Sequence, residues 1–235
     1  MLQILLSSPV GLFGIDWAEM CDLQSVALGE TAYMVLISGA LACLIGTPLG
    51  ILLTVTSRRH LLPCPVLNMG LGWIINAMRS VPFIILMVAI IPLTRLVAGT
   101  SIGTTAALVP LTLAAAPFVA RVVENALREV DPGVIEAAQS MGATPRQIIW
   151  HVLLPEALPG VLAGLTLMVV SLIGYSAMAG TIGGGGLGDL AIRYGYQRFR
   201  PDVMVITVII LIVMVQGCQS LGDGIVSRIY RRRGK

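Results

Sequence analysis

Long runs of apolar residues without a charged side chain set the fold class of this chain. Four windows contain no Asp, Glu, Lys or Arg: residues 31–56, 96–120, 157–188 and 203–222. A fifth window, residues 66–94, is interrupted only by Arg79. About 20 consecutive apolar residues are enough for a helix to cross the hydrocarbon core of a bilayer. We therefore expect an all-α, multi-pass integral membrane protein whose five transmembrane helices form one domain, residues 31–222.

The composition excludes an ordinary soluble domain. Hydrophobic residues make up 56% of the chain and charged residues 11%, against about 25% charged residues in soluble domains. The four cysteines form no CxxC pair, and the two histidines have no Cys or acidic partner at metal-ligand spacing. We expect no disulfide framework, no metal site and, at a net charge of +3, no nucleic-acid partner.

The first basic residues orient the chain in the membrane. Arg58 and Arg59 follow the first window directly, and Lys and Arg concentrate in cytoplasmic loops. The N-terminus is therefore expected outside and the basic tail, residues 223–235, in the cytoplasm. No basic n-region precedes the first window, which argues against a cleaved signal peptide. Residues 1–30 are expected to form an extracytoplasmic or interfacial segment.

Three arginines run against this orientation. They lie in the loop between the fourth and fifth windows, which the span count puts outside: Arg193, Arg198 and Arg200. The span count and the basic tail both favour an N-terminus outside and a C-terminus in the cytoplasm, so we keep this orientation.

A polar stretch, residues 121–156, separates the third and fourth windows and carries two helix-start signals. Asp131-Pro132 and Thr144-Pro145 each pair an N-cap residue with a proline at the first helical position. Gly142 stands where the first helix must end and the chain must turn. We expect two short helices that meet at Gly142, a second helix that ends at Pro155, and a docking surface on the cytoplasmic side.

The order of residues in this stretch forms a specific pattern. It reads Glu136-Ala137-Ala138, three residues, Gly142, nine residues and a Val152-Leu153-Leu154-Pro155 closure. The pattern resembles the cytoplasmic coupling loop of ABC importer permeases, with Val152 where that family prefers isoleucine. Residues 79–86, 116–127 and 174–178 are similar to the methionine-import permease subunit in particular. The resemblance covers about residues 31–222.

The resemblance implies a function and a set of partners. It implies the membrane subunit of a bacterial inner-membrane importer for D- or L-methionine, which a soluble substrate-binding protein delivers from outside. It also implies two copies of an ABC ATPase subunit that bind ATP and Mg²⁺, with no cofactor and no catalytic residue in this chain. The sequence contains no GxxxxGK[ST] motif, so ATP hydrolysis is expected of the separate subunit. One coupling loop per chain predicts a C2 homodimer with the pathway on its axis.

The resemblance assigns the ATPase-coupling role to Glu136, Ala137, Ala138, Gly142 and Pro155. The two alanines are expected to be small enough for the coupling helix to seat closely on the ATPase. Glu136 is expected to favour the positive end of the helix dipole and to pair with an ATPase arginine. Gly142 permits the change of direction.

Candidate residues of the translocation path carry two interpretations each. Arg79 either has a functional role, lining the path or holding the kink beside Pro82, or is a structural charge that bonds helix carbonyls near the cytoplasmic side. Ser171 and Tyr175, one helical turn apart, either contact the solute or bond across helices. Met178 either lines the path with its thioether or fills a gap in the packing.

Glycine and proline patterns predict how the helices pack. Gly46–Gly50 and Gly160–Gly164 are GxxxG patterns, which are typical of close helix contact. Prolines within windows should kink their helices: Pro48, Pro82, Pro110 and Pro117. Residues 180–188 contain a formal GxGxxG but no βαβ unit. They are expected to form either a flexible outer turn that meets the binding protein or a plain re-entrant turn.

Two alternatives remain on the residues alone. A secondary transporter would carry more spans, inverted repeats and mid-membrane acidic residues, whereas the only acid near a window is Glu30 at its outer end. An ABC permease for another amino acid or small polar solute would share every feature of the coupling loop.

Overall fold

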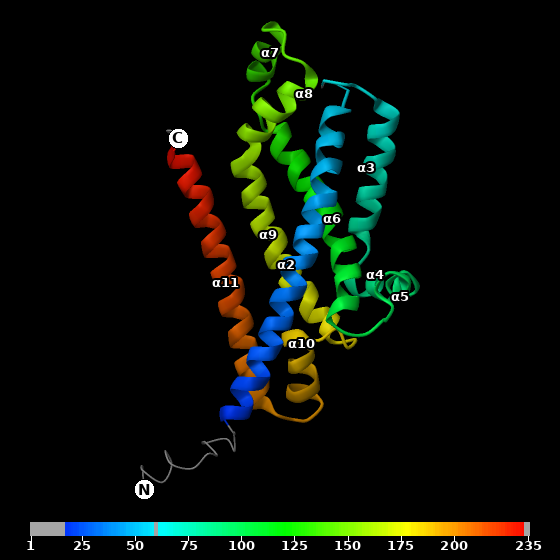
Figure 1. The fold of residues 1–235 in the computed structure, drawn as a ribbon, viewed down its shortest axis with the longest axis vertical. Coiled ribbons are helices and arrows are strands. Elements are labelled where there is room, and N and C mark those ends of the chain that lie inside the picture. The colour runs from blue at the N-terminus through cyan, green and yellow to red at the C-terminus, as the bar shows by residue number, and fades with distance from the viewer. Residues whose placement is uncertain (1–16, 59–60, 233–235) are drawn as a thin grey trace. The chain divides into compact units, whose positions relative to one another are not determined.

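The computed structural model describes residues 17–58 and 61–232. The interfacial segment expected at the N-terminus lies largely outside these residues, as do Arg59, His60 and residues 233–235. Every regular element in the described part of the chain is a helix. Figure 1 traces these helices in chain order.

Four long helices carry most of the apolar windows: α2 (Trp17–Val55), α6 (Thr104–Arg128), α9 (Leu154–Gly180) and α11 (Pro201–Arg232). The stretches long and apolar enough to cross a bilayer are Ala18–Val55, Thr104–Arg128, Pro145–Gly180 and Pro201–Arg231. Helices α3 (Pro65–Ser80) and α4 (Phe83–Ala89) pass the same test together. Counting this pair as one span gives five, the number that the sequence predicts.

The pair α3 and α4 is bent by 102° at the break between them. The break contains Pro82, which lacks a backbone N–H and disfavours a helical conformation of the residue before it. Val81 accordingly has extended backbone angles, so the predicted kink at Pro82 is confirmed. Helix α2 continues through Pro48.

Shorter helices connect the long ones. They are α5 (Ile91–Ala98), α7 (Pro132–Ser140), α8 (Pro145–Ile148), the π-helix η1 (Ile149–Leu153), α10 (Gly186–Leu190) and the π-helix η2 (Ala191–Tyr196). The helix bounds differ from the charge-free windows, since α2 begins at Trp17 and α6 continues to Arg128. A window ends at the first charged residue, whereas a helix can continue through charged residues, as α11 does through Asp223 and Arg228.

The chain divides into two units, which are described separately. The first contains the chain up to Ser38, Ile84–Leu111 and Ser171–Gly217. The second contains Gly39–Phe83, Thr112–Val170 and the chain from Cys218 onward.

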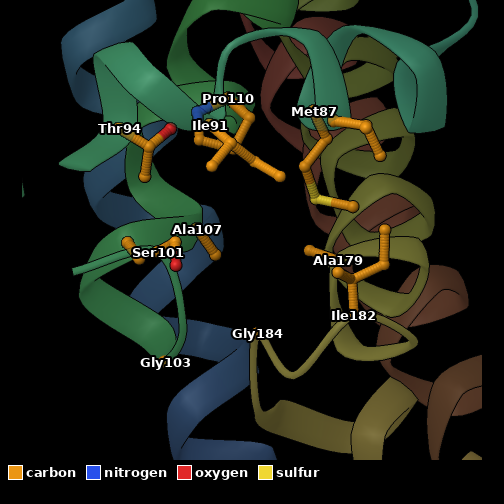
Figure 2. A pocket seen from close by; sticks show the side chains of 12 residues that line it. Met87, Ile91, Thr94, Ser101, Gly103, Ala107, Pro110, Ala179, Ile182 and Gly184 are labelled. Atoms are coloured by element: carbon orange, nitrogen blue, oxygen red, sulfur yellow. The ribbon is translucent and has the colours of Figure 1, made fainter.

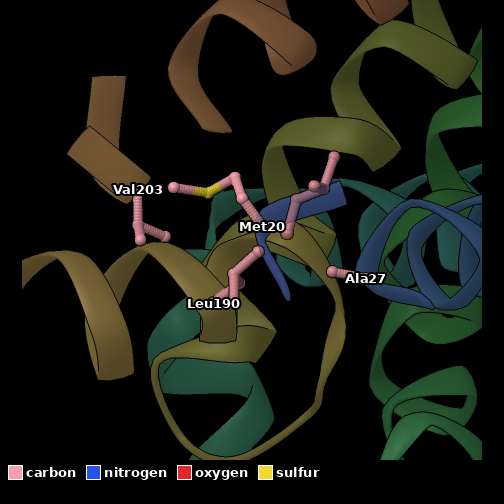
Figure 3. Close-up of a cluster of buried hydrophobic side chains, with 5 residues drawn as sticks. Met20, Ala27, Leu190 and Val203 are labelled. Carbon is pink, nitrogen blue, oxygen red and sulfur yellow. The ribbon is translucent and has the colours of Figure 1, made fainter. Parts of the chain in front are cut away.

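A buried apolar cluster anchors the first unit. It joins α2, α10 and α11 through Met20, Ala27, Leu187, Leu190 and Val203 (Figure 3). Beside it the Gln24 side-chain amide donates to Thr207 Oγ1 at 2.8 Å, and both residues are buried. This hydrogen bond pairs the amide nitrogen of Gln24, whereas the oxygen Oε1 is buried without a partner among the described residues. Because breaking the bond would leave the nitrogen unpaired as well, the contact favours this register of α2 against α11.

The glycine-rich segment of the first unit is closely packed. Gly186 N–H donates to Glu30 Oε2 at 2.6 Å, and Leu187 N–H donates to Thr31 Oγ1 at 2.9 Å. Gly186 has a φ of +76°, and a Cβ there would lie 2.6 Å from Thr31 Oγ1. The glycines therefore serve a tight turn that is hydrogen-bonded to α2.

Both GxxxG patterns pack against α6 in the second unit, one from α2 and one from α9. A Cβ at Gly50 of α2 would lie 2.5 Å from the Ala120 carbonyl oxygen. A Cβ at Gly164 of α9 would lie 2.2 Å from Val122 Cγ1. A side chain at either position would collide with α6, so the predicted helix-packing role is confirmed.

Gly50→Ala is expected to destabilise the permease fold by about 1–3 kcal/mol, because the added methyl group has no space against α6. The measurement is the thermal unfolding midpoint of the purified protein in detergent. Gly70→Ala on α3 is the matched control, since nothing lies within 4 Å of its Cβ position. Both changes gain the same helix propensity, so equal midpoints for the two variants would contradict the packing argument.

Candidate functional site

Helix α7 begins as the sequence predicts. Asp131 is its N-cap, and Asp131 Oδ1 accepts a hydrogen bond from Gly133 N–H at 2.8 Å. Pro132 follows as the first helical residue, where its missing N–H costs nothing. A nine-residue helix is thus defined from its first turn.

The end of α7 is also closed by local hydrogen bonds. Gly142 N–H donates to the Gln139 carbonyl at 2.9 Å, and Ala143 N–H donates to the Ala138 carbonyl at 3.1 Å. This pair of bonds is the Schellman arrangement, which needs a left-handed residue after the helix. Gly142 supplies it with a φ of +80°. The predicted stop at Gly142 is confirmed.

A capping box starts the next helix. Thr144 N–H donates to Gln147 Oε1 at 2.8 Å, and Gln147 N–H donates back to Thr144 Oγ1 at 3.4 Å. These reciprocal bonds satisfy two orphan donors of α8. Two short, capped helices therefore meet at Gly142, as expected (Figure 1).

The expectation that Pro155 ends the second short helix is wrong. Helices α8, η1 and α9 follow one another directly, and Pro145–Gly180 counts as a single helical stretch. The residues just before Pro155 form a π-helix, in which Leu154 N–H donates to the Ile149 carbonyl. A proline lacks an N–H and clashes with the carbonyl four residues earlier, and the wider π-turn relieves both problems.

The alanine pair of α7 divides between two faces. Ala137 is exposed, whereas Ala138 is buried with only 5% of its surface accessible. Helix α7 packs against α8 and η1 of the same unit. The small size of Ala138 therefore serves packing inside this chain, and Ala137 is the small residue available to a partner.

Glu136 lies beyond the first turn of α7. A helix dipole acts mainly on its first and last turns, so the expected dipole contribution does not apply at this position. The side chain is exposed, and the structure shows no ion pair between Glu136 and any described residue. Its carboxylate is accessible to a cationic group of a partner.

Large apolar side chains on the same segment were missed by the sequence reasoning. Met141 is 82% exposed, Trp150 is 67% exposed and Val134 is 45% exposed. Exposed aromatic and methionine side chains are characteristic of protein interfaces. A tryptophan within a polar stretch was the available signal.

An ion-pair network at the end of α6 was also missed. Arg121 Nη1 lies 2.5 Å from Glu124 Oε2, and Arg128 Nη2 lies 2.6 Å from Glu124 Oε1. The Glu124 side chain is 2% exposed. The spacing of these residues, three and four apart, puts them on one helix face, and this was the signal that could have found them.

Arg121 also joins α6 to α3. Its Nη2 group donates to the Gly72 carbonyl at 3.0 Å and to Asn76 Oδ1 at 2.8 Å. Nearby, the Asn68 side-chain amide donates to the Leu53 carbonyl at 2.5 Å. Helices α2, α3 and α6 are thus linked by polar contacts inside the second unit.

The candidate path residues fall into both units. Arg79 is exposed in the last turn of α3, just before the bend at Pro82. Ser171, Tyr175 and Met178 lie on α9 in the first unit, where Met178 is 46% exposed. Their spacing places Ser171 with Tyr175, and Tyr175 with Met178, on neighbouring positions of one helix face.

A small cavity in the first unit has little room for a solute. Its volume is about 30 Å³, and its lining includes Met87, Thr94, Ser101 and Ala179 (Figure 2). A cavity of this size accommodates one or two water molecules. The Thr94 hydroxyl already donates to the Ile90 carbonyl.

Comparison with known proteins places this architecture in a family. Residues 46–235 match the model of the family described as the binding-protein-dependent transport system inner membrane component. The chain belongs to this family. It is an ABC permease, and the resemblance indicated by its coupling-loop residues is confirmed.

Named relatives and a solved structure resemble this permease over most of its length. The probable D-methionine transport system permease protein MetI of Vibrio cholerae is 57% identical over 90% of this chain and 94% of its own. The D-methionine transport system permease protein MetI of Escherichia coli K12 is 52% identical over 64% and 70%. A structure of inward-facing conformations of the MetNI methionine ABC transporter matches at 46% identity and a TM-score of 0.88, over 90% of this chain and 98% of that one.

A more distant structure supports the fold alone. An amino acid ABC transporter crystallised with histidines matches the permease at a TM-score of 0.75 and 21% identity, over 90% of this chain and 96% of that one.

Proposed function

We infer that this permease is the membrane-spanning subunit of an ATP-driven importer of methionine, in its D or L form. The observation that carries the proposal is 57% identity to a probable D-methionine transport permease along 90% of the chain. The similarity to the MetNI methionine ABC transporter, at 46% identity and a TM-score of 0.88, supports it as well.

The assembly contains two copies of this chain, two ABC ATPase subunits and an extracytoplasmic substrate-binding protein. One α7–α8 segment per chain serves one ATPase, and ABC importers work with two ATPases, so a C2 dimer with the pathway on its axis meets both requirements. ATP and Mg²⁺ bind to the ATPase, because the permease sequence has no P-loop motif. This chain holds no cofactor and has no ATPase activity of its own.

The permease lies with its N-terminus outside the inner membrane and its C-terminus in the cytoplasm. The arginines that oppose this orientation are engaged locally. Arg193 pairs with Asp189, Arg200 lies 3.0 Å from Asp202, and the Arg198 guanidinium lies 4.3 Å from the centre of the Tyr194 ring. Because these arginines interact with neighbouring side chains, they should influence the membrane orientation less than Arg58 and the basic tail do.

Coupling follows from the continuity of the helices. Helix α7 is capped at both ends and packs on α8 and η1, so it moves with them. Because α8 and η1 run into α9 without a break, displacement of the α7–α8 segment by ATPase closure is carried along α9. In this account the docking residues include Glu136, Ala137 and Trp150, and Gly142 sets the angle between the two short helices.

Trp150→Ala is expected to weaken association of the permease with its ATPase by about 2 kcal/mol, or about 30-fold, because exposed tryptophans become interface hot spots. The measurement is the dissociation constant for the purified ATPase in detergent. Phe199→Ala is the matched control, since Phe199 is an aromatic residue 87% exposed on a different segment. If both changes weaken association equally, Trp150 does not belong to the ATPase interface.

Affinity purification of the tagged permease from solubilised membranes tests the assembly. An ABC ATPase should copurify at one copy per permease chain. Purification of the permease alone, with active solute uptake in the same membranes, would favour a secondary transporter and overturn the proposal.

A further inference from the structure

A polar pocket opens on the second unit where α2, α3 and α6 meet. We call it the α3–α6 pocket. Its volume is about 320 Å³, within the range of about 300–1,000 Å³ typical of small-molecule sites. Its lining consists of Leu53, Asn68, Met69, Gly72, Trp73, Asn76, Arg121, Glu124 and Arg128.

The pocket carries a net positive charge. It contains two guanidinium groups, Arg121 and Arg128, and one carboxylate, Glu124. Each Glu124 oxygen is occupied by one of these arginines, and Glu124 is 2% exposed. The carboxylate therefore has no exposed surface with which to attract a cation, and one positive charge is left over.

Donor groups for an anion remain in the pocket. A guanidinium has five N–H donors, and Arg128 makes one contact here, from Nη2 to Glu124. The Arg128 side chain is 52% exposed, so its other donors are accessible. Arg121 is held by three partners, and its buried Nε has none among the described residues.

Two of the lining residues are apolar and exposed. Trp73 is 73% exposed and Met69 is 74% exposed, and both lie on α3 beside the polar residues. A lining that combines a net positive charge with an aromatic and a thioether side chain fits a ligand with an anionic end and an apolar side chain. An arginine inside an apolar helical protein is costly unless it has such a function or a full set of partners.

We propose that the α3–α6 pocket binds the carboxylate of the transported amino acid. Arg128 contacts the carboxylate through the planar, two-pronged geometry that suits this group. Arg121 and Glu124 are positioning residues that hold Arg128 and α3 in place. Trp73 and Met69 contact the apolar side chain of the solute. This inference rests on the proposed function for the identity of the solute.

Protection of an introduced thiol tests the proposal directly. Gly72→Cys is made in a permease whose native cysteines, Cys21, Cys43, Cys64 and Cys218, are replaced by serine. Gly72 lines the pocket without an assigned solute contact, and a Cβ there would lie 3.5 Å from Arg121 Nη2, so the thiol fits. The variant is assembled with its ATPase in detergent, and its reaction with a maleimide is timed. L-methionine at ten times its dissociation constant should slow the reaction about tenfold by mass action. Methioninol, which has the same side chain without the carboxylate, should give no protection.

Arg128→Gln in the same background should abolish protection by L-methionine. It leaves one arginine facing one carboxylate, so the Arg121–Glu124 pair is kept. Arg128→Lys, which retains the charge but not the two-pronged geometry, should give weaker protection and covers the case in which the glutamine variant does not fold. Arg95→Gln on α5, an exposed arginine outside the pocket, is the control and should protect as the parent does.

The outcomes separate this inference from the proposed function. ATP-dependent methionine uptake by the parent complex tests the function by itself. If uptake is normal but L-methionine gives no protection, or methioninol protects equally, the pocket is not the carboxylate site and the function stands. Protection that survives Arg128→Gln would also overturn the assignment of Arg128.

Discussion

Gly142→Pro is expected to reduce solute uptake to background while the permease still inserts into the membrane and ATP hydrolysis by its partner continues. Gly142 has a φ of +80° and donates its N–H to the Gln139 carbonyl. Proline is fixed near −65° and has no N–H, so it fits neither requirement. Helix α7 would lose the hydrogen bonds that cap its C-terminal end, and its angle to α8 would change. Movement of the ATPase would then no longer be transmitted to α9.

The measurement is made on one proteoliposome sample in two assays, solute uptake and binding-protein-stimulated ATP hydrolysis. Gly142→Asn is the matched control, because asparagine adopts the left-handed conformation and keeps its N–H. The control should retain most uptake. Normal uptake together with normal stimulated hydrolysis in the proline variant would show that this turn does not couple ATP hydrolysis to transport.

Glu124→Leu is expected to destabilise the permease by about 2–3 kcal/mol, the upper range for hydrogen bonds to a charged group. This is less than the loss from a fully buried ion pair, because Arg128 is 52% exposed and Arg121 is 21% exposed. Both Glu124 oxygens are engaged and the side chain is 2% exposed, so its loss leaves two uncompensated arginines on α6. The thermal unfolding midpoint in detergent is the readout.

A triple variant supplies the control for this prediction. Arg121→Met, Glu124→Leu and Arg128→Met together replace the whole network by apolar side chains of similar size. Such replacements are often neutral for stability, so the triple variant should melt near the parent. If single and triple variants melt alike, the cost lies in packing and not in unpaired charge.

Local signals in the sequence predicted the turn at Gly142 well. Asp131, Gly142 and Thr144 act on backbone groups within five residues of themselves, and their hydrogen bonds need no distant partner. Four charge-free windows, and a fifth interrupted only by Arg79, likewise predicted the number of spans, because burial of a bare charge in lipid is unfavourable wherever it occurs.

The features that the sequence did not predict depend on contacts with other parts of this chain. Helix α6 continues past residue 120 because Arg121 finds Glu124 on its own helix and Gly72 and Asn76 on another. The chain passes Pro155 because a π-turn precedes it. Ala138 is buried because α7 packs on η1. Periodicity and charge counts do not contain these contacts.

Uptake of radiolabelled L-methionine into proteoliposomes that contain this permease, its ATPase and its binding protein tests the central claim most directly. We expect accumulation that requires ATP and that unlabelled methionine suppresses while glutamine does not. Accumulation without ATP, or equal suppression by glutamine, would contradict it.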